Sequence, residues 1–377
     1  MEFPSLAELK ARNTRKWTVY PEDVLPLFVA ESDFPTDPAV KQTILHAVEN
    51  ESFGYTPATS DLPEALADFY AERFGWRPDP AKVFTVADVV RGMLLGIQYF
   101  TRPDSPVIVP VPTYPPFLEL PEAAGRERID VQAEGGLDLT EIEEAFRAGA
   151  GSLLLAAPNN PLGYTFSADF LRELIDLAAR YDARLIVDEI HAGIVFDGAH
   201  VPAASLGETA EQVCITVTAT SKAWNIAGLK CAQIIFSNDA DVRTWQKLTG
   251  VAKDGTGTLG VWAAATCYRE GGPHLEAQVE YLHTTRDWVA KELEENIPGI
   301  KVTRPAATYL MWIDFSGTRI GHLEKPAAWL VENAKVALNE GVTFGPGGAH
   351  HARLNFATSP EILAEAIGRL ADAIAQA

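Results

Sequence analysis

The 377-residue sequence is poor in cysteine and has no long apolar run. Its three cysteines, Cys214, Cys231 and Cys267, are far apart and form no CxxC pair, so we expect neither a disulfide framework nor a zinc site. The first residues, MEFPSLAELKARNTRKW, lack an apolar core of signal-peptide length. No later run reaches the roughly 20 apolar residues of a membrane span. These absences predict a cytoplasmic protein without membrane contact.

Positive charge is also scarce. The chain has 31 Lys and Arg residues against 51 Asp and Glu residues, a formal net charge of -20. An acidic exterior repels phosphate backbones, so nucleic acid is not an expected partner. In such a chain, a cation next to polar motifs indicates a local anion site, and Lys222, Lys230 and Arg353 are the candidates.

Five short apolar segments without alternation predict strands covered on both faces, at residues 105–112, 152–158, 183–189, 213–219 and 231–237. Between the second and third lies SADFLRELIDLAARYD, which has one apolar helical face and Ser167 as a candidate N-cap. A strand, a helix and a strand in this order predict a parallel crossover. Repeated crossovers predict an α/β sheet covered by helices, with ligands at the carboxyl ends of the strands.

After about residue 285 the pattern changes. The segments TYLMWIDF and ARLNFATS predict strands, and KPAAWLVENAKVALN and SPEILAEAIGRLADAIAQA predict helices, the last with Ser359 as N-cap and Pro360 at its first position. No linker separates this part, so we expect lobes with a shared interface and the site between them. We predict a large domain at 46–284, and a small domain and N-terminal segment formed by 1–45 with 285–377.

Polar residues follow the predicted strands. Asn160 comes after the second strand, Asp188 and His191 close the third, and Lys222 comes after the fourth. Parallel strands would bring these groups to one edge of the sheet. A desolvated lysine has a lowered pKa, and a neutral amine forms Schiff bases with carbonyls such as the aldehyde of pyridoxal phosphate.

The other residues match what that cofactor needs. Its ring nitrogen requires a carboxylate, which Asp188 supplies, and its ring hydroxyl requires hydrogen-bond partners such as Asn160 and His191. Its phosphate requires donors and positive charge. Lys230 supplies the charge, and the helix predicted in TVADVVRGMLLGIQYF supplies the backbone amides of Val89 and Val90 at its amino terminus.

The order of NNPLG, VDEIH, SKAWNIAGLK and RLNF resembles fold-type-I pyridoxal-phosphate enzymes of the aminotransferase class I/II superfamily over nearly the whole chain. DVLPLFVAESDF, FGYTP, TYPPF and TYLMWIDF are similar to the cystathionine β-lyase or AecD-like carbon–sulfur lyase branch. The resemblance implies the aspartate-aminotransferase-like fold, with a large, mostly parallel sheet domain and a smaller α+β domain. It also implies pyridoxal 5′-phosphate as cofactor, an amino-acid substrate, and elimination from L-cystathionine and cysteine S-conjugates to give thiol, pyruvate and ammonia, a step of methionine biosynthesis.

The resemblance also assigns roles to the residues at the cofactor ring. Lys222 would carry the Schiff base and remove the α-proton, and Asp188 would pair with the ring nitrogen. Asn160 and His191 would bond the ring hydroxyl, and Tyr114 would stack on the ring.

Further roles concern the phosphate, the substrate and the neighbouring subunit. Lys230 stands where many relatives have a phosphate-binding arginine, and Arg353 would bind the substrate carboxylate with help from the backbone at Ala30. Tyr55 resembles the residue that reaches the cofactor phosphate of the neighbouring subunit, which would make the protein a homodimer.

Two positions depart from the family pattern. Ala219 occupies a place where relatives often carry a phosphate-binding serine, so Thr220 or Ser221 would have to substitute. Asp88 stands where a glycine is common, and its carboxylate would repel a phosphate unless it caps the helix.

Several alternatives remain open. An aminotransferase would use the same groups, and a regulatory protein that binds a partner could keep the same fold.

GTGTLG at 255–260 fits a dinucleotide motif, but a polar helical segment precedes it rather than a buried strand. His350 and His351 invite a metal interpretation, yet adjacent residues of a strand point to opposite faces, so we expect no metal.

Overall fold

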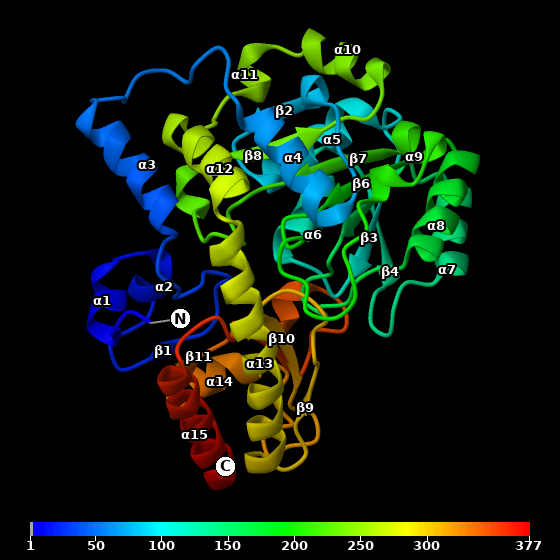
Figure 1. The fold of residues 1–377 in the computed structure, drawn as a ribbon. Coiled ribbons are helices and arrows are strands. Elements are labelled where there is room, and N and C mark those ends of the chain that lie inside the picture. The colour runs from blue at the N-terminus through cyan, green and yellow to red at the C-terminus, as the bar shows by residue number, and fades with distance from the viewer. Residues whose placement is uncertain (1–2) are drawn as a thin grey trace.

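The computed structural model describes residues 3–377, in which a seven-stranded sheet forms the centre of the larger part (Figure 1). The order is β2-β8-β7-β6-β5-β3-β4; β8 is antiparallel to both of its neighbours, and the other pairs are parallel. The strands are β2 (Val83–Val86), β3 (Val107–Val111), β4 (Arg128–Gln132), β5 (Ser152–Ala156), β6 (Arg184–Asp188), β7 (Cys214–Thr218) and β8 (Ala232–Ile235). All five apolar segments predicted as strands are therefore strands, and the crossover between β5 and β6 is parallel as predicted.

Helices cover both faces of this sheet, which explains why its strands are continuously apolar. Leu154 and Ile186 pack in one layer with α5 and α6, whereas Leu153 and Val187 pack in the opposite layer with α7 and α8. The covering helices are α5 (Val89–Phe100), α6 (Pro115–Ala123), α7 (Leu139–Arg147), α8 (Ala168–Arg180), α9 (Glu208–Val213) and α10 (Asp239–Lys247). The hydroxyl of Ser167 accepts a hydrogen bond from the Phe170 amide, which confirms the predicted cap of α8.

The smaller part contains a four-stranded antiparallel sheet of order β12-β13-β10-β9 and a parallel pair of β1 with β11. Its strands are β1 (Leu25–Pro26), β9 (Lys301–Val302), β10 (Leu310–Asp314), β11 (Val336–Ala337), β12 (Asn339–Glu340) and β13 (His351–Asn355). Its helices are α14 (Pro326–Asn333) and α15 (Pro360–Gln376). Ser359 caps α15 and Pro360 is its first residue, as predicted.

The helix predicted over KPAAWLVENAKVALN is too long. It ends at Asn333, and Lys335 takes a left-handed conformation with φ of 55°. Val336 and Ala337 then pair with Leu25 and Pro26. This pairing with a segment about 310 residues earlier in the chain overrides the local helical pattern.

Long helices connect the two parts. Figure 1 shows α12 (Thr258–Glu270) and α13 (Gly272–Asn296) following one another from the large sheet to the smaller part. The remaining helices are α1 (Leu6–Ala11), α2 (Arg15–Thr18), α3 (Pro38–Glu49), α4 (Leu62–Phe74) and α11 (Gly250–Lys253), with short 3₁₀ turns η1 (Pro80–Lys82), η2 (Ala203–Ser205), η3 (Ala227–Leu229) and η4 (Gly341–Phe344). The predicted boundary between 284 and 285 lies within α13, and the division into domains stays a prediction.

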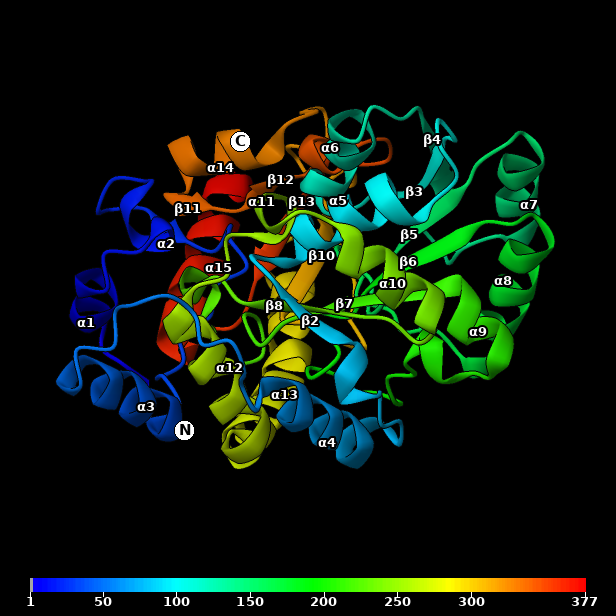
Figure 2. The same cartoon turned by 90° about the horizontal axis from the view of Figure 1, so that it is seen from above.

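Figure 2 shows the N-terminal helices α1 to α3 on one side of the molecule and α7 to α9 on the other. Among residues 3–377, no helix combines the length and the apolar character needed to cross a membrane. The GTGTLG segment follows α11 and runs into α12, because Gly257 is the N-cap of α12 and Thr258 its first residue. It therefore lacks the strand-to-helix turn of a dinucleotide site.

Candidate active site

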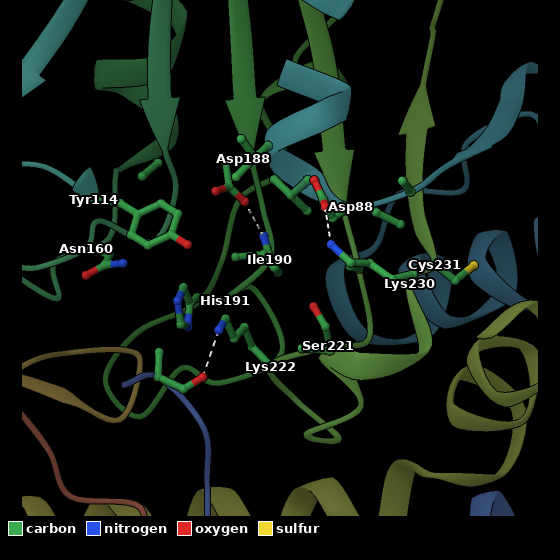
Figure 3. Close-up of a pocket in the computed structure, with 18 residues that line it drawn as sticks. Asp88, Tyr114, Asn160, Asp188, Ile190, His191, Ser221, Lys222, Lys230 and Cys231 are labelled. Carbon is green, nitrogen blue, oxygen red and sulfur yellow. Dashed lines mark hydrogen bonds and ion pairs between the residues drawn. The ribbon is translucent and has the colours of Figure 1, made fainter. Parts of the chain in front are cut away.

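A cavity of about 210 Å³ opens at the carboxyl ends of the central strands (Figure 3). Ten of the twelve residues predicted for the site line it: Ala30, Val89, Val90, Tyr114, Asn160, Asp188, His191, Ser221, Lys222 and Lys230. Arg353 reaches the cavity indirectly through Asn160, and Tyr55 does not line it. The cavity therefore gathers groups that are separated by up to 200 residues along the chain.

The order of the sheet explains this convergence. Strands β5, β6 and β7 are direct neighbours and run in parallel, so their carboxyl ends share one edge. Asn160 follows β5, Asp188 is the last residue of β6, and Lys222 follows β7. Figure 3 shows the side chains of Asp188, His191 and Lys222 directed into the same space.

Asp188 is a buried acid with an unusual pKa. Its side chain is 7% exposed, and one carboxylate oxygen accepts a hydrogen bond of 2.9 Å from the Ile190 amide. Burial raises the pKa of Asp188 to about 7, against the lowering effects of the Ile190 amide and the Lys222 charge. A cation placed beside this carboxylate would stabilise its ionised form.

Lys222 is half-buried at the opposite side of the cavity. Its Nζ donates a hydrogen bond of 2.7 Å to the carbonyl oxygen of Ala30. Burial lowers the pKa of Lys222 to about 8, and the positive charge of Arg353 adds to this effect. A large fraction of neutral amine is therefore present near pH 8, as a nucleophile or a general base requires.

His191 and Tyr114 both line the cavity, and the imidazole of His191 has a ring nitrogen to offer a ligand. His191 is 3% exposed, and its Nδ1 has no hydrogen-bond partner within residues 3–377. Burial holds the pKa of His191 well below its ordinary value, with further lowering by the charges of Lys222 and Arg353, so the imidazole is neutral. A buried imidazole nitrogen without a partner fits a ligand that brings a hydrogen-bonding group.

The start of α5 forms one wall of the cavity. The Asp88 carboxylate caps this helix by accepting a 2.8 Å hydrogen bond from the Arg91 amide, and its other oxygen lies 2.7 Å from the Nζ of Lys230. Burial alone would raise the pKa of Asp88, but the contacts with Lys230 and Arg91 lower it overall. Asp88 therefore caps α5, which is the condition under which we expected an acid to be tolerated at this position. Lys230 neutralises its charge while keeping a place on the cavity wall.

Of the two hydroxyl residues considered in place of the expected serine, Ser221 is the one in the cavity wall. It lines the cavity, whereas Thr220 is 1% exposed and does not. Ala219, which occupies the place of the expected serine, lines the same wall.

Arg353 lies on β13 and is 2% exposed. Its Nη1 donates 3.0 Å to Oδ1 of Asn160, its Nη2 donates 3.2 Å to the Phe28 carbonyl, and its guanidinium lies 4.9 Å from the Phe344 ring centre. Burial lowers the pKa of Arg353 to about 10, so the side chain remains charged at neutral pH. Its Nε lacks a partner among the described residues, which leaves capacity to bind a carboxylate.

The sequence reasoning missed the residues that hold the segment 28–32 over the cavity. The Tyr309 hydroxyl donates 3.2 Å to the Ala30 carbonyl, the same oxygen that accepts from Lys222. The Asn355 amide donates to the carbonyls of Val29 and Glu31 at 2.8 and 2.7 Å. Tyr309 and Asn355 lie in the motifs TYLMWIDF and RLNF. A polar group within an apolar segment was the sequence feature that could have indicated them.

The two adjacent histidines have structural contacts. The Nδ1 of His350 lies 2.9 Å from the Leu323 carbonyl, and the His351 ring stacks on Trp312 with 5.2 Å between ring centres. Tyr55 is fully exposed, and its proposed role in a neighbouring site is not tested by a single chain.

The chain matches known proteins over nearly its whole length. The family model described as "Aminotransferase class I and II" matches residues 22–370. A cystathionine β-lyase from Corynebacterium glutamicum is 54% identical over 374 residues, which cover 99% of this chain and all of that protein.

Two solved structures show the same fold. One is a protein from Corynebacterium diphtheriae assigned as a PLP-dependent β-cystathionase, with 54% identity, a TM-score of 0.98, and coverage of 100% of this chain and 99% of that one. The other is a PLP-bound protein from Clostridium difficile assigned as an aminotransferase, with 29% identity, a TM-score of 0.92, and coverage of 99% and 98%. The chain therefore has the fold-type-I architecture, and it belongs to the aminotransferase class I and II family.

Proposed function

We propose that this protein is a pyridoxal 5′-phosphate-dependent carbon–sulfur β-lyase that cleaves L-cystathionine and related cysteine S-conjugates. The observation that carries the proposal is the 54% identity to a cystathionine β-lyase over the full chain, in a protein whose cavity is lined by Asp188 and Lys222 and whose Arg353 bonds the lining residue Asn160. The overall reaction consumes water and gives a thiol, pyruvate and ammonia. With cystathionine the thiol is homocysteine, which suits a role in methionine biosynthesis.

The cavity residues suit this cofactor. Asp188 would pair with the protonated ring nitrogen, whose positive charge offsets the cost of burying the carboxylate. Neutral His191 and the Asn160 amide would bond the ring hydroxyl, and Tyr114 would stack on the ring. The phosphate would lie at the amino terminus of α5, beside Ser221 and Lys230.

When bound, the cofactor supplies an aldehyde that joins amines and a ring system that takes up negative charge from the substrate α-carbon. Arg353 would bind the substrate carboxylate, which fixes the amino acid in one orientation. Lys222, in its neutral form, would take the α-proton as a general base. The electron pair left by that proton forms the new double bond as the bond from the β-carbon to sulfur breaks and the thiolate leaves.

An aminotransferase is the second candidate, favoured by the family match and by the PLP-bound relative assigned to that activity. Both activities need the same base and the same carboxylate site. Incubation of the holoenzyme with L-cystathionine, with and without an added keto acid, separates them. Release of pyruvate and thiol without an added keto acid supports the lyase. Amino transfer to an added keto acid, without thiol release, would overturn it.

We propose further that the active unit is a cytoplasmic homodimer in which Tyr55 completes the neighbouring site. The support is a group of exposed apolar side chains on α3, the loop after it and α11: Leu45, Val48, Phe53, Tyr55 and Val251. The three buried, unpaired cysteines suit a reducing compartment.

Mixed dimers test the arrangement. A hybrid of one Tyr55→Ala subunit and one Lys222→Ala subunit has one complete site if Tyr55 acts across the interface. Random mixing should then restore about one quarter of wild-type activity, since half of the dimers are hybrids with one site each. Absence of any restoration, with hybrid formation confirmed by mass spectrometry, would place Tyr55 in its own subunit's site, and a fully active Tyr55→Ala homodimer would place it outside both sites.

A further inference from the structure

A second buried carboxylate directly follows Asp188. Glu189 is 1% exposed and does not line the cavity. Side chains alternate along β6, so that Ile186 packs on the side of α5 and α6, and Val187 on the side of α7 and α8. Asp188 continues the first series and faces the cavity. Glu189 therefore points to the opposite side of the sheet, and the proposed chemistry gives it no role.

Glu189 has two polar partners in this buried place. The Tyr70 hydroxyl on α4 donates a 3.1 Å hydrogen bond to Oε2, and the His200 Nε2 lies 3.1 Å from the same oxygen. The side chains of Glu189 and His200 are 0% and 3% exposed. The Phe74 ring packs edge-on against His200, with 4.9 Å between ring centres. A carboxylate buried this deeply requires compensating partners, and the His200 ring and the Tyr70 hydroxyl are the polar groups placed beside it.

We propose that Glu189, His200 and Tyr70 form a positioning cluster that fixes the end of β6 and sets the charge environment of Asp188 from the far side of the sheet. The inference deepens the proposed function, because it assumes that Asp188 holds the ring nitrogen of the cofactor.

The backbone provides one route from the cluster to the site. The Glu189 amide donates 2.8 Å to the Val217 carbonyl, and the Glu189 carbonyl accepts a 3.4 Å hydrogen bond from the Thr218 hydroxyl. Both partners are on β7, the strand that leads to Lys222. Anchoring the Glu189 side chain therefore also fixes the register of the acid against the strand that carries the amine.

Charge provides the second route. Burial is the main reason that the pKa of Asp188 rises to about 7, and the negative charge of Glu189 raises it further. The His200 ring, 3.1 Å from Oε2 of Glu189, is the group placed to compensate this charge. Burial and the Glu189 charge raise the pKa of Tyr70 well above its ordinary value, so Tyr70 remains a neutral donor. The other titratable groups near the cluster are Tyr268 on α12, Cys214 on β7 and Arg184 on β6.

Cofactor binding to the apoprotein tests the cluster without relying on catalysis. Wild type, Glu189→Gln, His200→Gln and the double variant are titrated with pyridoxal 5′-phosphate between about pH 5 and pH 9, a range that brackets the ordinary carboxyl and imidazole values. Binding is followed by quenching of tryptophan fluorescence, and the pH at which half of the affinity is lost on the acid side is compared. Far-UV circular dichroism confirms folding of each variant.

The expected shifts have opposite signs. Glu189→Gln removes a neighbouring negative charge, so Asp188 should stay ionised to lower pH and the midpoint should fall by about 0.5–1 pH unit. His200→Gln leaves the Glu189 charge uncompensated, so the midpoint should rise by about the same amount. The double variant should behave like Glu189→Gln. Tyr70→Phe should weaken binding by about 2–10-fold at every pH without moving the midpoint, because it removes one neutral hydrogen bond.

A purely structural role predicts weaker binding in all variants with an unchanged midpoint, and that result overturns the proposal. Equal shifts of Glu189→Gln and His200→Gln in one direction overturn it as well. If His200→Gln does not fold, the proposal is tested by the midpoints of Glu189→Gln and the double variant, which should both fall. If the variants show these shifts in cofactor binding but the wild-type protein releases no thiol from cystathionine, the lyase function is refuted and the proposed role of the cluster is not.

Discussion

The lysine that makes the site reactive should also make the apoprotein less stable. Lys222 is half-buried, and within residues 3–377 its amine has one hydrogen-bond partner, the Ala30 carbonyl. Replacing it with methionine keeps a side chain of similar length and removes the charge. We predict that the Lys222→Met apoprotein has a larger free energy of unfolding than the wild-type apoprotein at neutral pH, even though it loses catalysis.

The magnitude and its pH dependence follow from the pKa of Lys222. That pKa falls from 10.5 to about 8 on folding. Below about pH 8 the amine is charged in both states, and the full cost of burying the charge is present. Between about pH 8 and 10.5 the unfolded chain binds more protons than the folded one, so wild-type stability rises with pH. A change of 2.5 pKa units corresponds to about 3 kcal/mol, and we expect about 2–3 kcal/mol because the amine is partly solvated in the cavity.

Urea denaturation of both apoproteins, at equal protein concentration and at several pH values, measures this difference. The stability advantage of Lys222→Met should be present at about pH 8 and should shrink towards zero by about pH 10.5. Removing Lys222 also changes the titration of Asp188, but this coupling acts near pH 7, outside the window used. A stability difference that does not change between pH 8 and pH 10.5, or a less stable variant at pH 8, would refute the view that Lys222 is held against a desolvation cost.

Three further predictions concern neighbouring groups. The Asp188→Asn apoprotein should be more stable than wild type by about 2–4 kcal/mol above pH 7 in urea denaturation, and this difference should vanish as the pH falls to about 4, where the acid is protonated in both states. Arg353→Met should lower kcat/KM for cystathionine by about 30-fold or more, and Arg353→Lys should not restore it, because a buried carboxylate site needs the planar fork of the guanidinium. Lys230→Met should weaken binding of pyridoxal 5′-phosphate by about 2–10-fold in fluorescence titrations at low salt, and much less at high salt, since this ammonium is 57% exposed.

The sequence predicted the parts of the fold that depend on local pattern. Continuous apolar runs identified the strands buried on both faces, and Ser167 and Ser359 marked helix starts through hydroxyl groups that cap the first turn. The convergence of Asn160, Asp188 and Lys222 was also predictable, because consecutive parallel strands place their carboxyl ends at one edge. These inferences needed only the order of elements along the chain.

Contacts between distant segments were not predictable in the same way. The 28–32 segment lies over the cavity because Asn355 and Asn225 bind its backbone, over separations of roughly 190 to 330 residues. The early end of α14 has the same origin, since Val336 leaves the helical pattern to pair with Leu25. The sequence offers no period or spacing for such contacts, so only the three-dimensional arrangement reveals them.

Burial lowers the pKa of the base, Lys222, to about 8, and it also raises the pKa of the acid, Asp188, to about 7. The range in which the acid is ionised and a large fraction of the amine is neutral therefore begins only near pH 7–8. Any further negative charge near Asp188 would narrow it from the acid side. Glu189 is such a charge, one residue away, and this is why a compensating partner for it matters more here than at an ordinary buried carboxylate. Catalysis near neutral pH therefore depends on the far side of the sheet as well as on the cavity.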